Sequence, residues 1–146
     1  MNEIVGISEL TLRQKIFTAE AWMKQQPQLE LETRHYFSKD VYAREILIPA
    51  GTILVGEIHK YENLNILSKG SMIVSTEDAI VKVDAPFTIV SPPGTKRIAR
   101  ALTDCVWTTI HGTDERNVDL IKQKFIATSE QEYLEFCNVN QLTLFG

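Results

Sequence analysis

Residues 49–70, PAGTILVGEIHKYENLNILSKG, decide the fold, together with the shorter stretch 86–97, PFTIVSPPGTKR. The first stretch opens with a Pro-Ala-Gly turn and continues into a strand with an alternating pattern. One face of that strand carries Ile53, Val55, Glu57 and His59. A polar loop follows, and then a second strand runs to Gly70. Two titratable side chains on an otherwise apolar face indicate where a site lies, but they name no substrate.

The composition is that of a soluble globular domain. The chain has 146 residues, of which 44% are hydrophobic and 23% are charged, and we expect one domain spanning residues 1–146. A net charge of −4 argues against general binding to nucleic acid, which requires an excess of Lys and Arg. The N-terminus has no apolar signal segment, and no stretch is apolar enough to cross a membrane. We therefore expect a cytoplasmic protein that binds neither nucleic acid nor membrane.

The periodicity of the chain changes twice. A period of 3.6 predicts a helix over residues 8–25, capped by Ser8 or Thr11 and stopped by Pro27. From residue 29 to residue 111 the period is two, with turns at short intervals and no helical segment. Residues 114–138 then return to helical spacing as two short helices. This order predicts a mainly β, antiparallel sandwich or barrel with one N-terminal and two C-terminal helices.

The alternating segment Leu29–Phe37 is the first strand of this series. His35 lies on its apolar side, which fits either a core histidine or a ligand or base. An unpaired edge strand needs cover, and so does the apolar tail Leu142–Phe145. We therefore predict a homodimer or higher homo-oligomer with both segments at the interface.

The two opening stretches resemble the paired motifs of the cupin superfamily, which consists of small antiparallel jelly-roll barrels. The first cupin motif is a glycine, five residues, a His-any-His pair, a glutamate and a later glycine, and the second is a Pro-any-Gly turn with a histidine three residues on. Here the positions are Gly51, Glu57, His59, Asn63 and Gly70, and then Pro92, Gly94 and Arg97. The resemblance covers residues 41–111 and implies a cupin-like jelly-roll barrel over about 29–111. The pattern is also similar to small single-domain cupins encoded in bacteriophage genomes, which implies the host cytoplasm or the virion as its location.

Many cupins bind a divalent metal, and this chain departs from their ligand set. His59 keeps its type, and Glu57 could replace the first histidine as a ligand. Asn63 is a weak donor, and Arg97 cannot ligate a cation and repels one. His35 or His111 could substitute from neighbouring strands. No cofactor is expected, and a divalent metal held by Glu57 and His59 stays an alternative.

The same replacements suit an anionic ligand. Arg97, backed by Lys96 and Arg100, could bind a carboxylate or phosphate through two hydrogen bonds. His59 with Glu57 could act as a catalytic acid or base near neutral pH. The resemblance to metal-free cupins that isomerise or epimerise nucleotide-linked sugars adds further ligand-binding candidates, namely Tyr42, Arg44 and Tyr61. Alternatively, Glu57 and Arg97 pair with each other and only seal the barrel.

Three functions follow from this pattern. The first is a cupin-like accessory protein, phage-encoded, that binds a small anion or another protein. The second is a metal-independent isomerase or epimerase of a sugar nucleotide or small acid. The third is a metal-dependent cupin enzyme with a degenerate ligand set. The sequence leaves open whether the chain is an enzyme.

Overall fold

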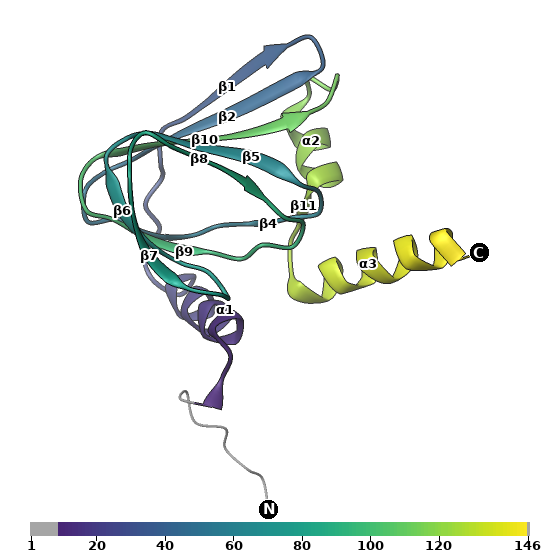
Figure 1. Ribbon diagram of the computed structural model, residues 1–146, viewed down its shortest axis with the longest axis horizontal. Coiled ribbons are helices and arrows are strands. Elements are labelled where there is room, and N and C mark those ends of the chain that lie inside the picture. Colours follow the sequence, from purple (N-terminus) through teal and green to yellow (C-terminus); the bar gives the residue numbers. More distant parts are fainter. Residues whose placement is uncertain (1–8, 146) are drawn as a thin grey trace, which may run out of the picture.

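Two facing antiparallel sheets form the body of the protein, as Figure 1 shows for the computed structural model. The structure describes residues 9–145, with side chains through residue 140. The five-stranded sheet has the order β1-β2-β10-β5-β8 and the four-stranded sheet the order β3-β9-β6-β7. A short two-stranded sheet pairs β4 with β11. The elements are α1 (Leu12–Met23), β1 (Thr33–Ser38), β2 (Val41–Ile48), β3 (Ile53–Val55), β4 (Ile58–His59), β5 (Asn63–Lys69), β6 (Ser71–Ser75), β7 (Ile80–Asp84), β8 (Phe87–Ser91), β9 (Ile98–Ala101), β10 (Cys105–Gly112), α2 (Val118–Phe125), β11 (Ile126–Ala127) and α3 (Glu130–Phe145).

This arrangement confirms a mainly β jelly-roll with one helix before the sheets and two after them. The expectation of a closed barrel was wrong, because the strands form three separate hydrogen-bonded sheets. The strand predicted from Ile53 to His59 is also divided in two. At the break, the Gly56 N–H donates to the Arg97 carbonyl oxygen, so β3 pairs with β9 and β4 pairs with β11.

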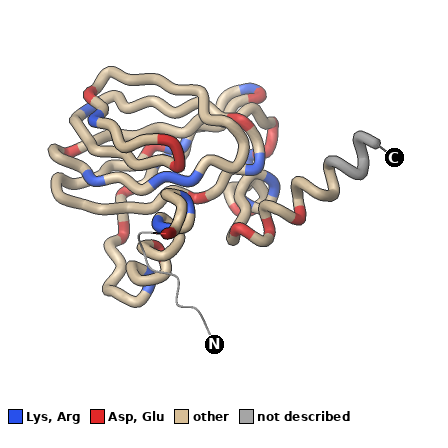
Figure 2. The backbone as a smooth tube through the Cα atoms, turned by 60° about the horizontal axis from the view of Figure 1, so that its bottom comes forward, with Lys and Arg blue, Asp and Glu red and all other residues tan. Residues whose placement is uncertain are grey.

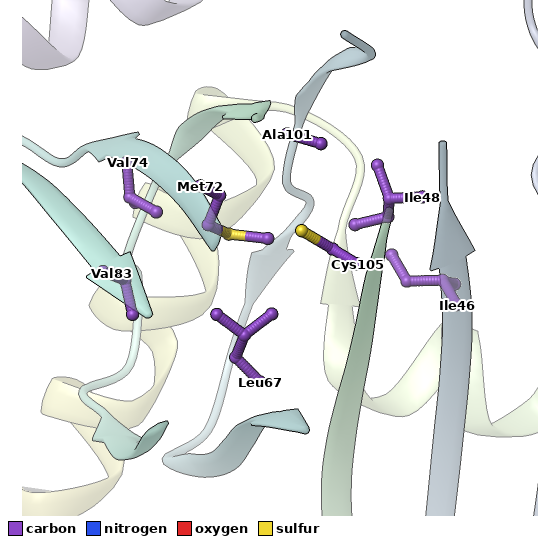
Figure 3. Close-up of a cluster of buried hydrophobic side chains, with 8 residues drawn as sticks. All are labelled: Ile46, Ile48, Leu67, Met72, Val74, Val83, Ala101 and Cys105. Carbon is purple, nitrogen blue, oxygen red and sulfur yellow. The ribbon is translucent and has the colours of Figure 1, made fainter. Parts of the chain in front are cut away.

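The hydrophobic core fills one end of the space between the two large sheets. It is a cluster of eight buried side chains: Ile46, Ile48, Leu67, Met72, Val74, Val83, Ala101 and Cys105. Figure 3 shows these side chains directed toward one another from both sheets. Leu31 and Trp107 pack against the cluster from its border. Alternation along β2, β5, β6 and β10 supplies this core, as the period of two predicted.

The first strand is shorter than predicted. β1 starts at Thr33, whereas Leu29 is 63% exposed. In the register of β1 with β2, Thr33 lies opposite Ile46, so Glu30 and Leu29 would lie opposite Pro49 and Ala50. Proline has no N–H to donate, and the pairing ends there with one bond from the Leu47 N–H to the Glu32 carbonyl oxygen. β1 is nevertheless an edge strand, and the predicted self-association through it stays a prediction.

The helices are capped by side chains close to the predicted ends. Thr11 begins α1 through a capping box with Gln14, so the helix is shorter than the predicted 8–25, and Ser8 lies outside the described residues. Asn117 caps α2 by accepting the N–H groups of Asp119 and Leu120, so this helix begins later than the predicted residue 114. α3 is longer than the short helix predicted and extends away from the sheets (Figure 1). The side chains of the apolar tail Leu142–Phe145 lie outside the described residues.

Ion pairs and hydrogen bonds connect α1 to the loop between β8 and β9 and to α3. The Lys96 Nζ atom lies 2.8 Å from the Glu20 carboxylate and donates to the Gly56 carbonyl oxygen at 2.8 Å. Arg13 donates to both carboxylate oxygens of Glu130 on α3 and to the Gly94 carbonyl oxygen. Figure 2 shows basic and acidic positions close together where α1 meets the body. No helix of the described chain has the length and apolar character needed to cross a membrane.

The glycines of the two motifs adopt backbone conformations that other residues avoid. Gly51, Gly70 and Gly94 have φ values of +84°, +91° and +80°. At Gly94 a β-carbon would also overlap the ring of Tyr133 on α3, whereas a β-carbon at Gly51 would meet no atom within 4 Å. The second motif therefore needs glycine for two independent reasons.

This difference gives a matched pair of variants. Gly51→Ala should lower the free energy of unfolding by roughly 1–2 kcal/mol, the cost of a left-handed conformation for alanine. Gly94→Ala should cost about 1–3 kcal/mol more, because the ring of Tyr133 must move. Urea unfolding of both variants measures the difference. Equal losses in the two variants would show that Tyr133 does not constrain the turn.

Candidate functional site

A cavity of about 280 Å³ lies between the two large sheets. It has a polar half and an apolar half. Polar side chains line the first half: Arg44, Glu57, His59, Asn63, Asn65, Ser91, Thr95, Arg97 and Thr109. Apolar side chains line the second: Ile46, Ile48, Leu54, Met72, Val74 and Ala99.

The register of the five-stranded sheet creates these two halves. On the inner face of β2, Tyr42 and Arg44 come before Ile46 and Ile48. Their partners on β10 are His111, Thr109, Trp107 and Cys105, in that order. β5 continues the pattern, since Asn65 lies opposite Thr109 and Leu67 lies opposite Trp107. Polar side chains therefore meet polar ones across three strands, and apolar side chains meet apolar ones.

The side-chain amide of Asn65 links these strands. Its Oδ1 atom accepts hydrogen bonds from Thr109 Oγ1 at 2.7 Å and from Trp107 Nε1 at 3.2 Å. Its Nδ2 group donates to Asn63 Oδ1 at 2.7 Å and to Ser91 Oγ at 2.6 Å. An amide can make four hydrogen bonds, and Asn65 makes all four within the protein. We did not predict this network, although the alternation of Asn63 and Asn65 within an apolar strand was a signal for it.

Two arginines enter the cavity, one from each side. Arg97 donates from Nη2 to Ser91 Oγ, which connects it to the Asn65 network. Arg44 lies on the opposite wall, on β2. Among the residues that the structure describes, neither guanidinium forms an ion pair with a carboxylate. Burial lowers the pKa of Arg97, which reflects the cost of desolvating its charge.

The predicted cationic group of Lys96, Arg97 and Arg100 does not form. Arg97, Ala99 and Ala101 face inward, so the residues between them face outward. Lys96 is bound to Glu20 of α1, and Arg100 is exposed. The alternation of the strand therefore brings only Arg97 to the cavity.

The Glu57–Arg97 pair that would seal the interior also does not form. Both residues are described, both line the cavity, and no ion pair joins them. Glu57 is exposed at the rim, in the irregular segment between β3 and β4. The catalytic role of Glu57 stays a prediction.

His59 forms a pair with His111. The His59 Nδ1 and His111 Nε2 atoms lie 2.9 Å apart, and the two rings stack with centroids 4.9 Å apart. Phe125 of α2 also stacks with His111, with ring centroids 4.4 Å apart. The buried His111 Nδ1 atom has no hydrogen-bond partner among the residues that the structure describes. Sequence reasoning named both histidines as candidates, and only the fold shows that they contact each other.

The two histidines are neutral at physiological pH. Burial, together with the neighbouring His111, Arg44 and Arg97, lowers the pKa of His59 to about 3. Burial also lowers the pKa of His111 to about 4. A general acid or base works best with a pKa near the operating pH, so His59 does not match the predicted role as a proton-transfer group near neutrality. In this state it is a neutral hydrogen-bonding group.

The remaining candidates are dispersed. Tyr42 and His111 line a small annex of about 30 Å³ that shares Arg44, Glu57 and His59 with the main cavity. His35 is exposed on β1, and its Nδ1 atom lies 2.6 Å from the Tyr42 hydroxyl. Tyr61 is 41% exposed and packs edge-on against Phe125 and Phe136. His35 and Tyr61 therefore lie outside the lining of both cavities.

The residues at the cupin ligand positions do not fit a metal ion. His59 uses its Nδ1 atom in the contact with His111, and Asn63 Oδ1 accepts from Asn65. Arg97 brings a positive charge into the same cavity. In the described part of the chain, no three His, Cys, Asp or Glu side chains gather as a metal-binding group.

Comparisons with known proteins bear on the fold. No protein-family model matches the sequence, and no curated protein is similar to it in sequence. Among solved structures, KdgF from Halomonas sp. has a TM-score of 0.52 at 16% identity, covering 66% of this chain and 90% of KdgF. A cupin superfamily protein from Desulfitobacterium hafniense has a TM-score of 0.49 at 11% identity, covering 61% of this chain and 83% of that one.

An RmlC-like cupin from Shewanella frigidimarina also has a TM-score of 0.49, at 18% identity, covering 63% of this chain and 89% of that one. The chain is similar in fold to these solved structures. The resemblance predicted from the two motifs is thereby confirmed. Identities this low extend the likeness to the fold alone, and the similarity to phage-encoded cupins stays a prediction.

The low pKa values of the histidine pair predict a loss of stability in acid. Between about pH 6.5 and 4 the unfolded chain binds more protons than the folded one, so the free energy of unfolding falls as the pH is lowered. At pH 5 the two groups together should cost roughly 2–4 kcal/mol relative to pH 7. Urea unfolding over this range, monitored by tryptophan fluorescence, measures the slope.

Two variants test which histidine causes this pH dependence of the free energy of unfolding. His111→Gln should remove a large part of the pH dependence between pH 6.5 and 5. His35→Gln serves as the comparison, because burial lowers the pKa of the more exposed His35 by less, and it should change the slope less. A slope that His111→Gln leaves unchanged would contradict a neutral, buried pair.

The donor set also predicts the metal content. After purification without a chelator, we expect well under one equivalent of zinc, iron, manganese or nickel per chain, because Arg97 repels a cation from the cavity. Elemental analysis of the purified protein measures this. One equivalent of metal that is lost in His59→Ala would contradict the expectation.

Proposed function

We propose that this cupin-fold protein binds a small organic anion in the cavity between its two sheets. The observation that carries the proposal is the pair of arginines, Arg44 and Arg97, which line one cavity and form no ion pair with any carboxylate of the described residues. A half-buried cation without a counter-charge costs free energy, and an anionic ligand offsets that cost. Arg97 is the principal contact, since Ser91 holds one side of its guanidinium and the other donors stay available.

The neutral histidine pair supports this proposal. Because His59 is neutral, the positive charge that faces an anion comes from the guanidiniums, and the neutral ring can add a hydrogen bond. The exposed Glu57 lies at the rim, where water screens its repulsion of an anion. We therefore infer a binding protein in preference to an isomerase that depends on His59 for proton transfer.

The arginine variants test this proposal. The probes are inorganic phosphate, acetate, hexanoate and glucose 1-phosphate, screened by thermal shift and measured by calorimetry. Arg97→Ala should weaken binding of the best probe by roughly tenfold or more, as expected for the loss of a charge-assisted hydrogen bond. Arg97→Lys should recover only part of it, because a lysine cannot make the two-pronged contact.

Arg100→Ala is the matched control. Arg100 lies three residues further along the same strand region and is exposed, so its loss removes the same charge without altering the cavity. Binding should be unchanged in this variant, and His59→Ala should retain most of it. If none of the probes raises the melting temperature, or if Arg97→Ala and Arg100→Ala bind alike, the proposal fails.

A further inference from the structure

We propose that the anion is a monocarboxylate with an apolar tail of about six carbons. This inference rests on the proposed function and names the ligand class of that same cavity. The carboxylate would bind between Arg44 and Arg97, and the tail would extend toward the core. The cavity has a polar and an apolar half, the hydrogen bonds of its polar wall are largely made within the protein, and its volume limits the size of a ligand.

The apolar half of the cavity requires an apolar partner. Ile48, Leu54, Met72 and Val74 line it together with Ala99. Met72 and Val74 belong to the core cluster of Figure 3, and both are at least 94% buried (2% and 6% exposed). A ligand bearing only charged and hydroxyl groups would lose hydration there without gaining hydrogen bonds. A hydrocarbon tail fits the chemistry of these walls.

The polar half offers few free hydrogen bonds for a sugar. Asn65 forms all four of its hydrogen bonds with protein groups. Three of the partners are Thr109, Trp107 and Ser91, whose own hydrogen-bonding groups are thereby occupied. Asn63 donates to the Tyr61 carbonyl oxygen and accepts from Asn65. Apart from the His59 ring, the charged donors that line the described cavity are the guanidiniums, whose planar geometry matches a carboxylate. Charge recognition therefore outweighs recognition of hydroxyl groups in this cavity.

The volume sets the size of the tail. A cavity of about 150 Å³ holds one benzene molecule. The cavity of this protein measures about 280 Å³, so it has room for a carboxylate and a hydrocarbon group of that size. Acids such as hexanoate and benzoate match these limits. A sugar nucleotide exceeds them.

A series of acids tests the tail. Acetate, butanoate, hexanoate and benzoate are titrated into the full-length protein by calorimetry, with glucose 1-phosphate and inorganic phosphate as competing anion classes. Each buried methylene should strengthen binding by up to roughly fourfold. Hexanoate should therefore bind at least about tenfold more tightly than acetate.

Filling the apolar half should remove the preference for hexanoate over acetate. Ala99→Leu adds three carbons inside the cavity, and it should weaken hexanoate roughly tenfold while acetate changes little. Ala43→Leu is the matched control, because Ala43 lies between the inward-facing Tyr42 and Arg44 and so points to the outer face of the sheet. Val74→Ala enlarges the cavity instead and should move the optimum to longer acids, which keeps the test decisive if Ala99→Leu does not fold.

The outcomes separate the two proposals. Binding that depends on Arg97 but not on tail length would overturn the tail and leave the anion site standing. Tighter binding of phosphate or glucose 1-phosphate than of any acid would also overturn the tail. Failure of every anion to bind would overturn both. A chain-length dependence that Ala99→Leu abolishes and Ala43→Leu preserves would establish the inference.

Discussion

The arrangement of the site depends on the four hydrogen bonds of the Asn65 side chain. They join Asn65 to Asn63 on the same strand, to Ser91 on β8, and to Thr109 and Trp107 on β10. A buried amide that lost one of these partners would cost about 1–3 kcal/mol, so the network holds three adjacent strands in one register. On β2, β10 and β5 the boundary between the polar and apolar halves therefore lies at the same level.

The side chains of the Asn65 network are neutral and bond to one another. The positive charge in the cavity therefore comes from Arg44 and Arg97. Ser91 connects Arg97 to the Asn65 network and so orients one guanidinium. Burial keeps His59 and His111 neutral, and the stacking of His111 on Phe125 ties this pair to α2. The cavity thus combines fixed positive charge with a desolvated, apolar interior, a setting in which electrostatic attraction is stronger than in water.

The loop before β9 contacts both the cavity and the helices that lie outside the sheets. Lys96 and Arg97 are consecutive, and alternation directs them to opposite sides. Lys96 binds Glu20 on α1, while Arg97 enters the cavity. Gly94, in the same loop, packs closely against Tyr133 of α3 and accepts a hydrogen bond from Arg13. The helices outside the sheets therefore support the position of the arginine inside them.

The sequence alone determined the β character, the two motif turns and the inward direction of Arg97, because alternation and turn chemistry act between near neighbours in the chain. Only the tertiary structure decided what each inward side chain meets. The bonds from Asn65 to Ser91 and Thr109 and the contact of His59 with His111 join residues 26, 44 and 52 positions apart. The same long-range pairing left His35 and Tyr61 outside the cavity and divided the predicted strand at Gly56. Local pattern sets the face to which a residue points, and strand pairing across the whole chain sets its partner.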